Sequence, residues 1–339
     1  MSRQKSEALI QRALAAVEEG DYDRAVGLAE EACDVDPEST EARLLLGEIA
    51  LDEMDFEAAL AYAEEAGNID PTDRDAQLLE AEASLMLDDL VRTVTVCESI
   101  LKEDPADQRA RHLMAEAILD LGSAAEAAAL FETILEEDDD YVDAWMGLAI
   151  AHFELGRYDE SLDGLKEVRR LAGDVADVFF YTGLNLERMG DEKGAKRAFA
   201  QAQEVDPETY PPPLLITLAE FEGIAEEVIG SLPDKLKAYM ANVPISVEEL
   251  PSEDDLRAAD PPLSPRIWGL FRGASILENN PDVIGSSQLP SEIVLYRRNL
   301  ERGCQDKDHL IEEIRTTLLH EIGHYLGWDE DEVAAHGLA

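Results

Sequence analysis

The run HEIGHYLGWDED near the C-terminus contains the residue types and the spacing that a catalytic metal site requires. His320 and His324 stand four residues apart, so that on a helix their imidazole rings share one face and can reach one ion. Zinc binds such ring nitrogens at about 2.0–2.1 Å. Glu321, on an adjacent face, could accept a proton from a water molecule beside the ion. The chemistry that this pattern predicts is hydrolysis by activated water.

A third ligand must come from elsewhere, because a catalytic zinc site has three protein ligands and one open position. His309 lies eleven residues before His320. That spacing corresponds to about 16 Å along a helix, which is too far to share the ion. Only fifteen residues follow His324, and WDEDE and one histidine are among them. The remaining candidates for the third ligand are Asp329, Glu330, Asp331, Glu332 and His336. Of these we rank Glu330 first, Asp331 second and His336 third.

The elements that must position these residues are read from local patterns. The longest is a helix over Asp308–Tyr325, with Asp306 or Asp308 as N-cap and Gly327 as its end. Shorter helices are predicted at Leu218–Ile229 and Leu236–Met240, and Leu250–Pro265 is predicted to be a loop with one helical turn. Strands are predicted at Val243–Val247, Ile267–Phe271 and Ile293–Arg297. These elements predict a small α+β domain over residues 210–339, which begins at the proline run 211–213.

The first two thirds of the chain repeat with a period of 34 residues. Each repeat has a proline slot, a turn slot and a slot for a small residue where two helices can cross closely. The proline slot holds Pro37, Pro71, Pro105 and Pro207; the turn slot holds Gly20, Gly122, Gly156 and Gly190; the small slot holds Ala25, Ala59, Thr93, Ala127, Ser161 and Ala195. In the third repeat the turn slot holds Asp88.

These slots resemble the tetratricopeptide repeat, a helix-turn-helix unit of 34 residues. The resemblance covers about six repeats and predicts an all-α solenoid over residues 1–209. It implies that protein or peptide partners bind along the concave face of the solenoid.

The C-terminal segment, from about Ile229 to the end, resembles the short bacterial zincin-like metallopeptidase domains called minimal matrix-metalloprotease-like. The motifs that carry this resemblance are IWGLFRG, LPSEIVLYRRNLERGC and HEIGHYLGWDEDE. It implies that His320, His324 and Glu330 bind Zn²⁺ and that Glu321 is the general base. No methionine follows Met240, so the methionine turn of the larger metzincins is missing.

Composition excludes several classes of partner. The chain has 339 residues, of which 28 are basic and 76 acidic, and its net charge is −48. Such a surface repels phosphate groups, so we expect neither nucleic acid nor membrane surfaces as partners. The charge serves solubility, or it forms an acidic groove for basic protein segments. The three cysteines are far apart, and the N-terminus has no apolar leader, so we expect a cytoplasmic protein.

Several other residues have two interpretations each. The stretch Ile293–Tyr296 is either the edge strand that pairs with an extended substrate or an ordinary core strand. Tyr325 and Arg298 either stabilise an oxyanion or serve the fold. Trp268 and Trp328 either line a pocket or pack in the core. Cys304 is expected to be a small buried residue.

The whole pattern predicts a zinc-dependent metallopeptidase in which the repeats recruit a substrate or partner. Two alternatives remain. In one, the chain is a scaffold that binds partners through its repeats and carries a structural or inactive zincin-like domain. In the other, the domain is a metal-dependent amidase that acts on small molecules in an enclosed pocket.

Overall fold

The computed structural model describes residues 2–214, 216–234, 236–237, 243–273 and 291–328. The chain divides into two compact units, Met1–Gly173 and Asp174–Ala339. The described part of the first unit is helical, and the second unit adds a three-stranded sheet to its helices. The predicted fold class, an all-α repeat array followed by a small α+β domain, is therefore confirmed. Our division of the chain into residues 1–209 and 210–339 stays a prediction.

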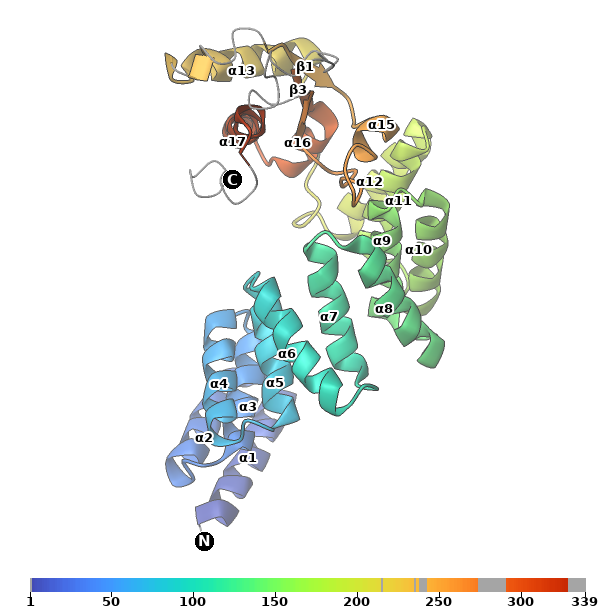
Figure 1. The fold of residues 1–339 in the computed structure, drawn as a ribbon. Helices are drawn as coiled ribbons and strands as arrows, with labels where there is room; N and C mark the ends of the chain where they lie inside the picture. Colours follow the sequence, from blue (N-terminus) through green and yellow to red (C-terminus); the bar gives the residue numbers. More distant parts are fainter. Residues whose placement is uncertain (1, 215, 235, 238–242, 274–290, 329–339) are drawn as a thin grey trace. The chain divides into compact units, whose positions relative to one another are not determined.

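The first unit consists of antiparallel helix pairs, each pair corresponding to one 34-residue repeat (Figure 1). Its helices are α1 (Ser2–Glu18), α2 (Tyr22–Val35), α3 (Thr40–Asp52), α4 (Phe56–Ile69), α5 (Arg74–Met86), α6 (Leu90–Glu103), α7 (Gln108–Asp120), α8 (Ala124–Glu137), α9 (Val142–Glu154) and α10 (Tyr158–Ala172).

The turn within each helix pair requires a left-handed backbone, which explains the recurring glycine. Gly20, Gly122 and Gly156 have φ of +75°, +83° and +70°. Met54 and Asp88 occupy the same slot with φ of +59° and +61°, a conformation that a side chain disfavours. After this turn an aspartate caps α2, α4 and α6 by accepting a hydrogen bond from the first helical turn.

The small slot is buried as predicted. Ala25, Ala59, Thr93, Ala127 and Ser161 are all fully buried. Each apolar core of the first unit involves helices that are near neighbours in the chain. The repeats therefore stabilise one another through neighbouring interfaces, as expected for a solenoid.

The second unit contains the sixth helix pair and the C-terminal domain, by which we mean elements α13 to α17. The pair consists of α11 (Ala176–Arg188) and α12 (Glu192–Val205). The domain comprises α13 (Leu218–Ser231), β1 (Ile245–Glu248), α15 (Glu253–Leu256), β2 (Gly269–Arg272), β3 (Glu292–Tyr296), α16 (Arg297–Gly303) and α17 (Lys307–Leu326).

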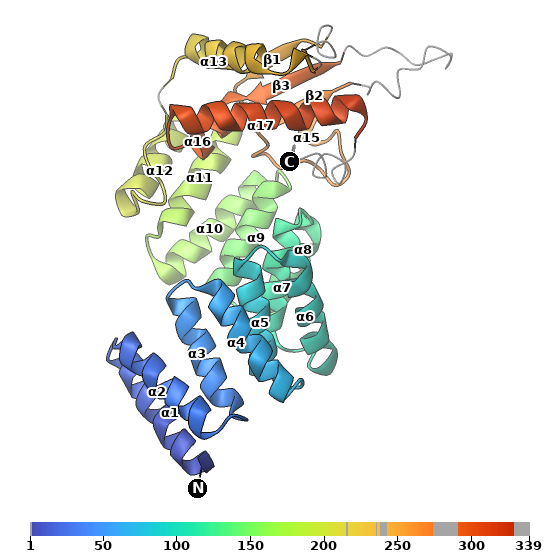
Figure 2. The same ribbon diagram turned by 90° about the vertical axis from the view of Figure 1, so that its left-hand side faces the viewer.

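The sheet has the order β1-β3-β2, with β1 parallel and β2 antiparallel to β3. Side chains of β3 alternate between its two faces, and Ile293 and Leu295 enter the main core. Helices α13 and α17 supply the rest of that core, α17 through Leu310, Ile314 and Leu318. Figure 2 shows α17 lying in front of the strands, with α13 beside it. The sheet thus supports the helix that carries both histidines.

Most predicted elements of the C-terminal domain are present within a few residues of their expected bounds. Two differences matter. Helix α16 is absent from the sequence prediction, which extends the third strand to Arg297, the first residue of this helix. Strand β3 lies between β1 and β2, so the idea that Ile293–Tyr296 is an edge strand is wrong, and its core interpretation holds. The predicted helix Leu236–Met240 falls largely outside the described residues.

Ion pairs connect the sixth helix pair to α16 within the second unit. The buried carboxylate of Glu187, on α11, accepts hydrogen bonds from Arg298 at 3.2 Å and from Arg302 at 2.7 Å. The Arg302 guanidinium also lies 4.8 Å from the centre of the Phe199 ring on α12. Arg188 donates to the carbonyl oxygen of Pro251 at 2.7 Å. Arg298 therefore serves the fold, one of its two expected roles.

None of the helices in the described part of the chain combines the length and the apolar character needed to cross a membrane.

Candidate metal centre

Helix α17 carries the candidate site residues, and its two caps and its buried face fix their positions. The Asp306 side chain accepts a hydrogen bond from the N–H of His309 at 2.9 Å, which makes Asp306 the N-cap. Gly327 ends the helix with φ of +88°. The core-facing residues Leu318 and Ile322 are fully buried. The predicted helix, its cap and its end are all present.

The two motif histidines converge on one point. Nε2 of His320 and Nε2 of His324 are 2.9 Å apart, and the two rings lie 4.6 Å apart at an angle of 79°. Two nitrogens that bind one tetrahedral zinc ion at about 2.0–2.1 Å stand about 3.3 Å apart. The observed separation is close to that value.

A backbone carbonyl favours the tautomer of His324 that a metal ligand needs. Nδ1 of His324 lies 3.3 Å from the carbonyl oxygen of Trp328, which can accept a hydrogen bond from a proton on Nδ1. With the proton on Nδ1, the lone pair is on Nε2, the atom that faces His320. Trp328 reaches this position because the chain turns back at Gly327, whose N–H bonds to the carbonyl of His324 at 2.9 Å.

The two imidazole nitrogens of His320 and His324 are suitable zinc ligands. The described residues contain only this part of the predicted ligand set. Among the residues that the structure describes, no group of three or more His, Cys, Asp or Glu residues could hold a metal ion. All candidates for the third ligand, the ranked residues Glu330, Asp331 and His336 among them, lie outside the described residues. The ligand set therefore stays a prediction.

The carboxylate of Glu321 is buried and bonded to the neighbouring strand. Glu321 is 7% exposed, and its Oε2 accepts a hydrogen bond of 2.6 Å from the backbone N–H of Phe271 on β2. A buried carboxylate needs such partners, because burial removes the water that would solvate its charge. The bond places the carboxylate between α17 and the sheet.

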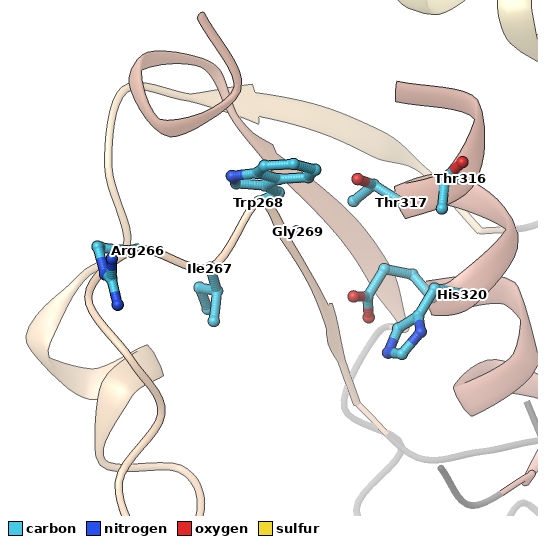
Figure 3. A pocket seen from close by; sticks show the side chains of 8 residues that line it. Arg266, Ile267, Trp268, Gly269, Thr316, Thr317 and His320 are labelled. Atoms are coloured by element: carbon cyan, nitrogen blue, oxygen red, sulfur yellow. The ribbon is translucent and has the colours of Figure 1, made fainter. Parts of the chain in front are cut away.

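A cavity of about 340 Å³ opens beside Glu321 and His320. Figure 3 shows Ile267 and Trp268 on the strand side and Thr316, Thr317 and His320 on the helix side. The lining is completed by Arg266, Gly269 and Glu321. Trp268 thus lines a pocket and also packs against the core, so both of its expected roles apply.

The other residues weighed from the sequence have structural surroundings. Cys304 is buried, and burial raises the pKa of its thiol to about 12, so that it stays protonated at neutral pH. The ring of Tyr325 packs 5.6 Å from that of Phe271.

Sequence analysis missed three groups that build the site: the N–H of Phe271, the small residue Gly269 and the guanidinium of Arg272. Arg272 binds both Asp255 and Glu248 at the end of β2. An arginine within an apolar strand is a signal for a buried ion pair. The backbone N–H has no such signal, because every residue except proline has one.

The family comparisons agree with this geometry. Residues 240–338 match the family described as zincin-like metallopeptidase. Residues 16–83, 119–178 and 177–209 match families described as tetratricopeptide repeat. The chain therefore combines tetratricopeptide repeats with a zincin-like metallopeptidase domain. The zincin-like match contains His320, Glu321 and His324, and also the predicted ligand Glu330. A comparison with curated protein sequences found no match.

Solved structures resemble the repeats. PilW, described as a widely conserved type IV pilus biogenesis factor, is 19% identical with a TM-score of 0.54, and the alignment covers 60% of this chain and 94% of PilW. PilF of Pseudomonas aeruginosa is 16% identical with a TM-score of 0.52, covering 66% and 99% of the two chains. At such identities these structures show a shared fold alone.

Proposed function

We propose that the protein is a zinc-dependent metallopeptidase whose tetratricopeptide repeats recruit the substrate or a partner protein. The observation that carries this proposal is the convergence of the His320 and His324 Nε2 atoms beside the buried carboxylate of Glu321. We further propose Glu330 as the third ligand, with Asp331 as its alternate, and a cytoplasmic location.

The chain's own residues have distinct roles in this proposal. A zinc ion held by His320 and His324 would polarise the substrate carbonyl and lower the pKa of water from about 15.7 to about 7. Glu321 takes the proton that water loses and returns it to the leaving nitrogen. The cavity beside Trp268 accommodates a substrate side chain, and the bond from Phe271 holds Glu321 in place.

A peptide substrate is supported by the position of β2. Among the strands that the structure describes, β2 is an outer one, and Gly269 on it lines the cavity. An extended peptide can pair with the backbone of such an outer strand ahead of Phe271, whose own N–H binds Glu321. This position of β2 favours a peptidase over an amidase with an enclosed pocket for small molecules.

Recruitment by the repeats is supported by glutamates that recur on the first helices of successive pairs. We call these first helices a layer. Glu48, Glu82 and Glu116 recur on α3, α5 and α7 at the 34-residue period. Glu82 already pairs with Arg109. The other two glutamates of this layer suit basic protein segments better than acidic ones.

The first test is metal content by elemental mass spectrometry. We expect about one zinc per wild-type chain, and loss of zinc in His320→Ala and Glu330→Ala. His309→Ala is the matched control, because His309 lies on the same helix but pairs with Glu313 at 3.2 Å. A folded wild-type protein that binds no zinc would contradict the proposal.

The second test separates the enzyme from a scaffold. Glu321→Gln should keep the zinc and lower cleavage of a proteome-derived peptide library by at least about 100-fold. If wild type and Glu321→Gln behave alike in cleavage, and partner binding depends on the repeats alone, the scaffold alternative is correct. Hydrolysis of small amides without peptide cleavage would indicate the amidase.

A further inference from the structure

Strand β2 directs two of its residues toward helix α17. In its antiparallel ladder with β3, Gly269 lies opposite Leu295 and Phe271 lies opposite Ile293. The N–H of Tyr296 bonds to the carbonyl of Trp268 at 2.8 Å. Because bonded and non-bonded pairs alternate in such a ladder, the backbone groups of Gly269 and Phe271 point away from β3.

The N–H of Phe271 therefore meets Glu321 rather than another strand. Its 2.6 Å bond to Oε2 of Glu321 is a bond to an ionisable carboxyl in a buried position. It ties one carboxylate oxygen to the sheet and so restricts the rotation of the whole group. Glu321 thereby has a defined orientation before any substrate arrives.

Gly269 is the residue that lets helix and strand come this close. A Cβ atom at this position would lie 2.5 Å from Cγ2 of Thr317 and 3.4 Å from Cγ of Glu321. It would also lie 3.2 Å from the carbonyl oxygen of Val294, so it could not simply turn toward the sheet. Thr317 is only 7% exposed and has little room to move. A side chain at position 269 therefore requires Thr317 to shift and strains the close approach of α17 to β2.

The end of β2 is held by a group of charges that is partly exposed, with Asp255 as its buried member. Arg272 donates to both oxygens of Asp255 at 2.7 Å, and to the two oxygens of Glu248 at 2.7 and 2.9 Å. Asp255 is 6% exposed. Because Arg272 follows Phe271 directly, this group fixes the strand next to the N–H that binds Glu321.

We propose that Gly269 and the backbone N–H of Phe271 are positioning groups that set the orientation of Glu321. The inference rests on the proposed function, in which Glu321 is the general base. Gly269 acts through the distance between α17 and β2, and the N–H acts through its bond to the carboxylate. Neither group touches the substrate's reacting atoms in this proposal.

The direct test is amide hydrogen exchange at Phe271, followed by NMR on the full chain without added zinc. We expect Phe271 to be protected in wild type and to exchange at least about tenfold faster in Glu321→Ala and in Gly269→Ala. Adding Thr317→Ser to Gly269→Ala removes Cγ2, the atom of the clash, and should restore most of the protection.

Two glycine variants serve as controls. A Cβ at Gly303 would lie 2.8 Å from Cζ2 of Trp268, so Gly303→Ala introduces a clash in the same domain but not between α17 and β2. A Cβ at Gly223 would meet nothing within 4 Å. Both variants should keep the protection of Phe271. Unchanged exchange at Phe271 in Gly269→Ala would overturn the proposal, as would equal loss in Gly303→Ala.

A kinetic arm uses quenched fluorescein-labelled casein as the probe. Gly269→Ala should lower kcat at least about tenfold with KM and zinc content unchanged, because orientation of the base affects the chemical step. Thr317→Ser should again restore it. A rise in KM alone would overturn the positioning role. If wild-type protein cleaves neither casein nor the peptide library, the proposed function fails, and exchange at Phe271 still decides whether the two groups orient Glu321.

Discussion

The repeats and the C-terminal domain differ in how often each stabilising contact occurs. In the repeats, the same slot is buried by Ala25, Ala59 and Ala127, and the same left-handed turn recurs at a 34-residue period. In the C-terminal domain, a single glycine, Gly269, lets α17 approach β2 closely, and a single arginine, Arg272, holds the end of that strand. Redundancy lets the repeats tolerate a poor residue such as Met54 in a turn. Within the described residues, the candidate metal centre depends on contacts that each occur once.

The two regions should differ most in how much free energy of unfolding they lose when a central arginine is removed from each. Arg272→Ala leaves the buried carboxylate of Asp255 without its cationic partner and should destabilise the C-terminal domain by about 3 kcal/mol. Arg92→Ala, which removes a half-exposed bridge to Glu64 and Glu80 in the repeats, should cost at most about 1 kcal/mol. Urea unfolding followed by the fluorescence of Trp268 and Trp328 for one region and Trp145 for the other checks this. Equal losses would remove the proposed contrast.

Zinc should stabilise one region only. At a free zinc concentration of about 100 times Kd, binding to the folded state adds about 2.7 kcal/mol. We expect a chelator to lower the unfolding temperature of the C-terminal domain and to leave the repeats unchanged in calorimetry. His320→Ala should abolish the effect, and His309→Ala should keep it. A zinc-dependent shift in the repeats would mean that the metal binds elsewhere.

Acid should weaken the C-terminal domain through Asp255. The hydrogen bonds from Arg272 and Ser252 lower the pKa of its carboxyl from 3.8 to about 2, against the opposing effect of burial. A carboxyl with a lowered folded-state pKa stabilises the protein above its unfolded pKa, and this stabilisation is lost as the pH falls from about 4 to about 2. The stability difference between wild type and Asp255→Asn should therefore shrink over that range, from at most about 2 kcal/mol. A constant difference would exclude Asp255 as the cause.

The smallest effect concerns the turn at Met54, whose side chain is 76% exposed. Met54→Gly relieves the positive φ of +59° and should stabilise the repeats by up to about 1 kcal/mol, partly offset by greater freedom of the unfolded chain. Met54→Ala is the matched control, since it loses the same exposed side chain but keeps Cβ. Thermal unfolding followed by circular dichroism compares them. Equal melting temperatures of the two variants would show that the positive φ at residue 54 does not lower the stability of the repeats.

The same contrast explains what could be predicted from the sequence. The repeats were predictable because each slot occurs several times, so that periodicity averages out exceptions such as Asp88. Helix α17 was predictable from the cap at Asp306 and the end at Gly327. The order of the strands was not, because the core strand β3 and an edge strand can have the same apolar composition. The bond from Phe271 to Glu321 depends on register and distance across 50 residues, which local patterns do not encode.

The ion pairs of the Glu187 carboxylate limit where the chain can be divided into fragments or joined to other repeats. A fragment that starts at residue 210 would lack the acceptor that Arg298 and Arg302 share, and it would expose two guanidinium groups beside a surface that Phe199 had covered. A fragment that starts at Asp174 keeps these groups together. Gene fusions that exchange the repeat array should therefore be spliced ahead of the sixth helix pair, which travels with the domain that follows it.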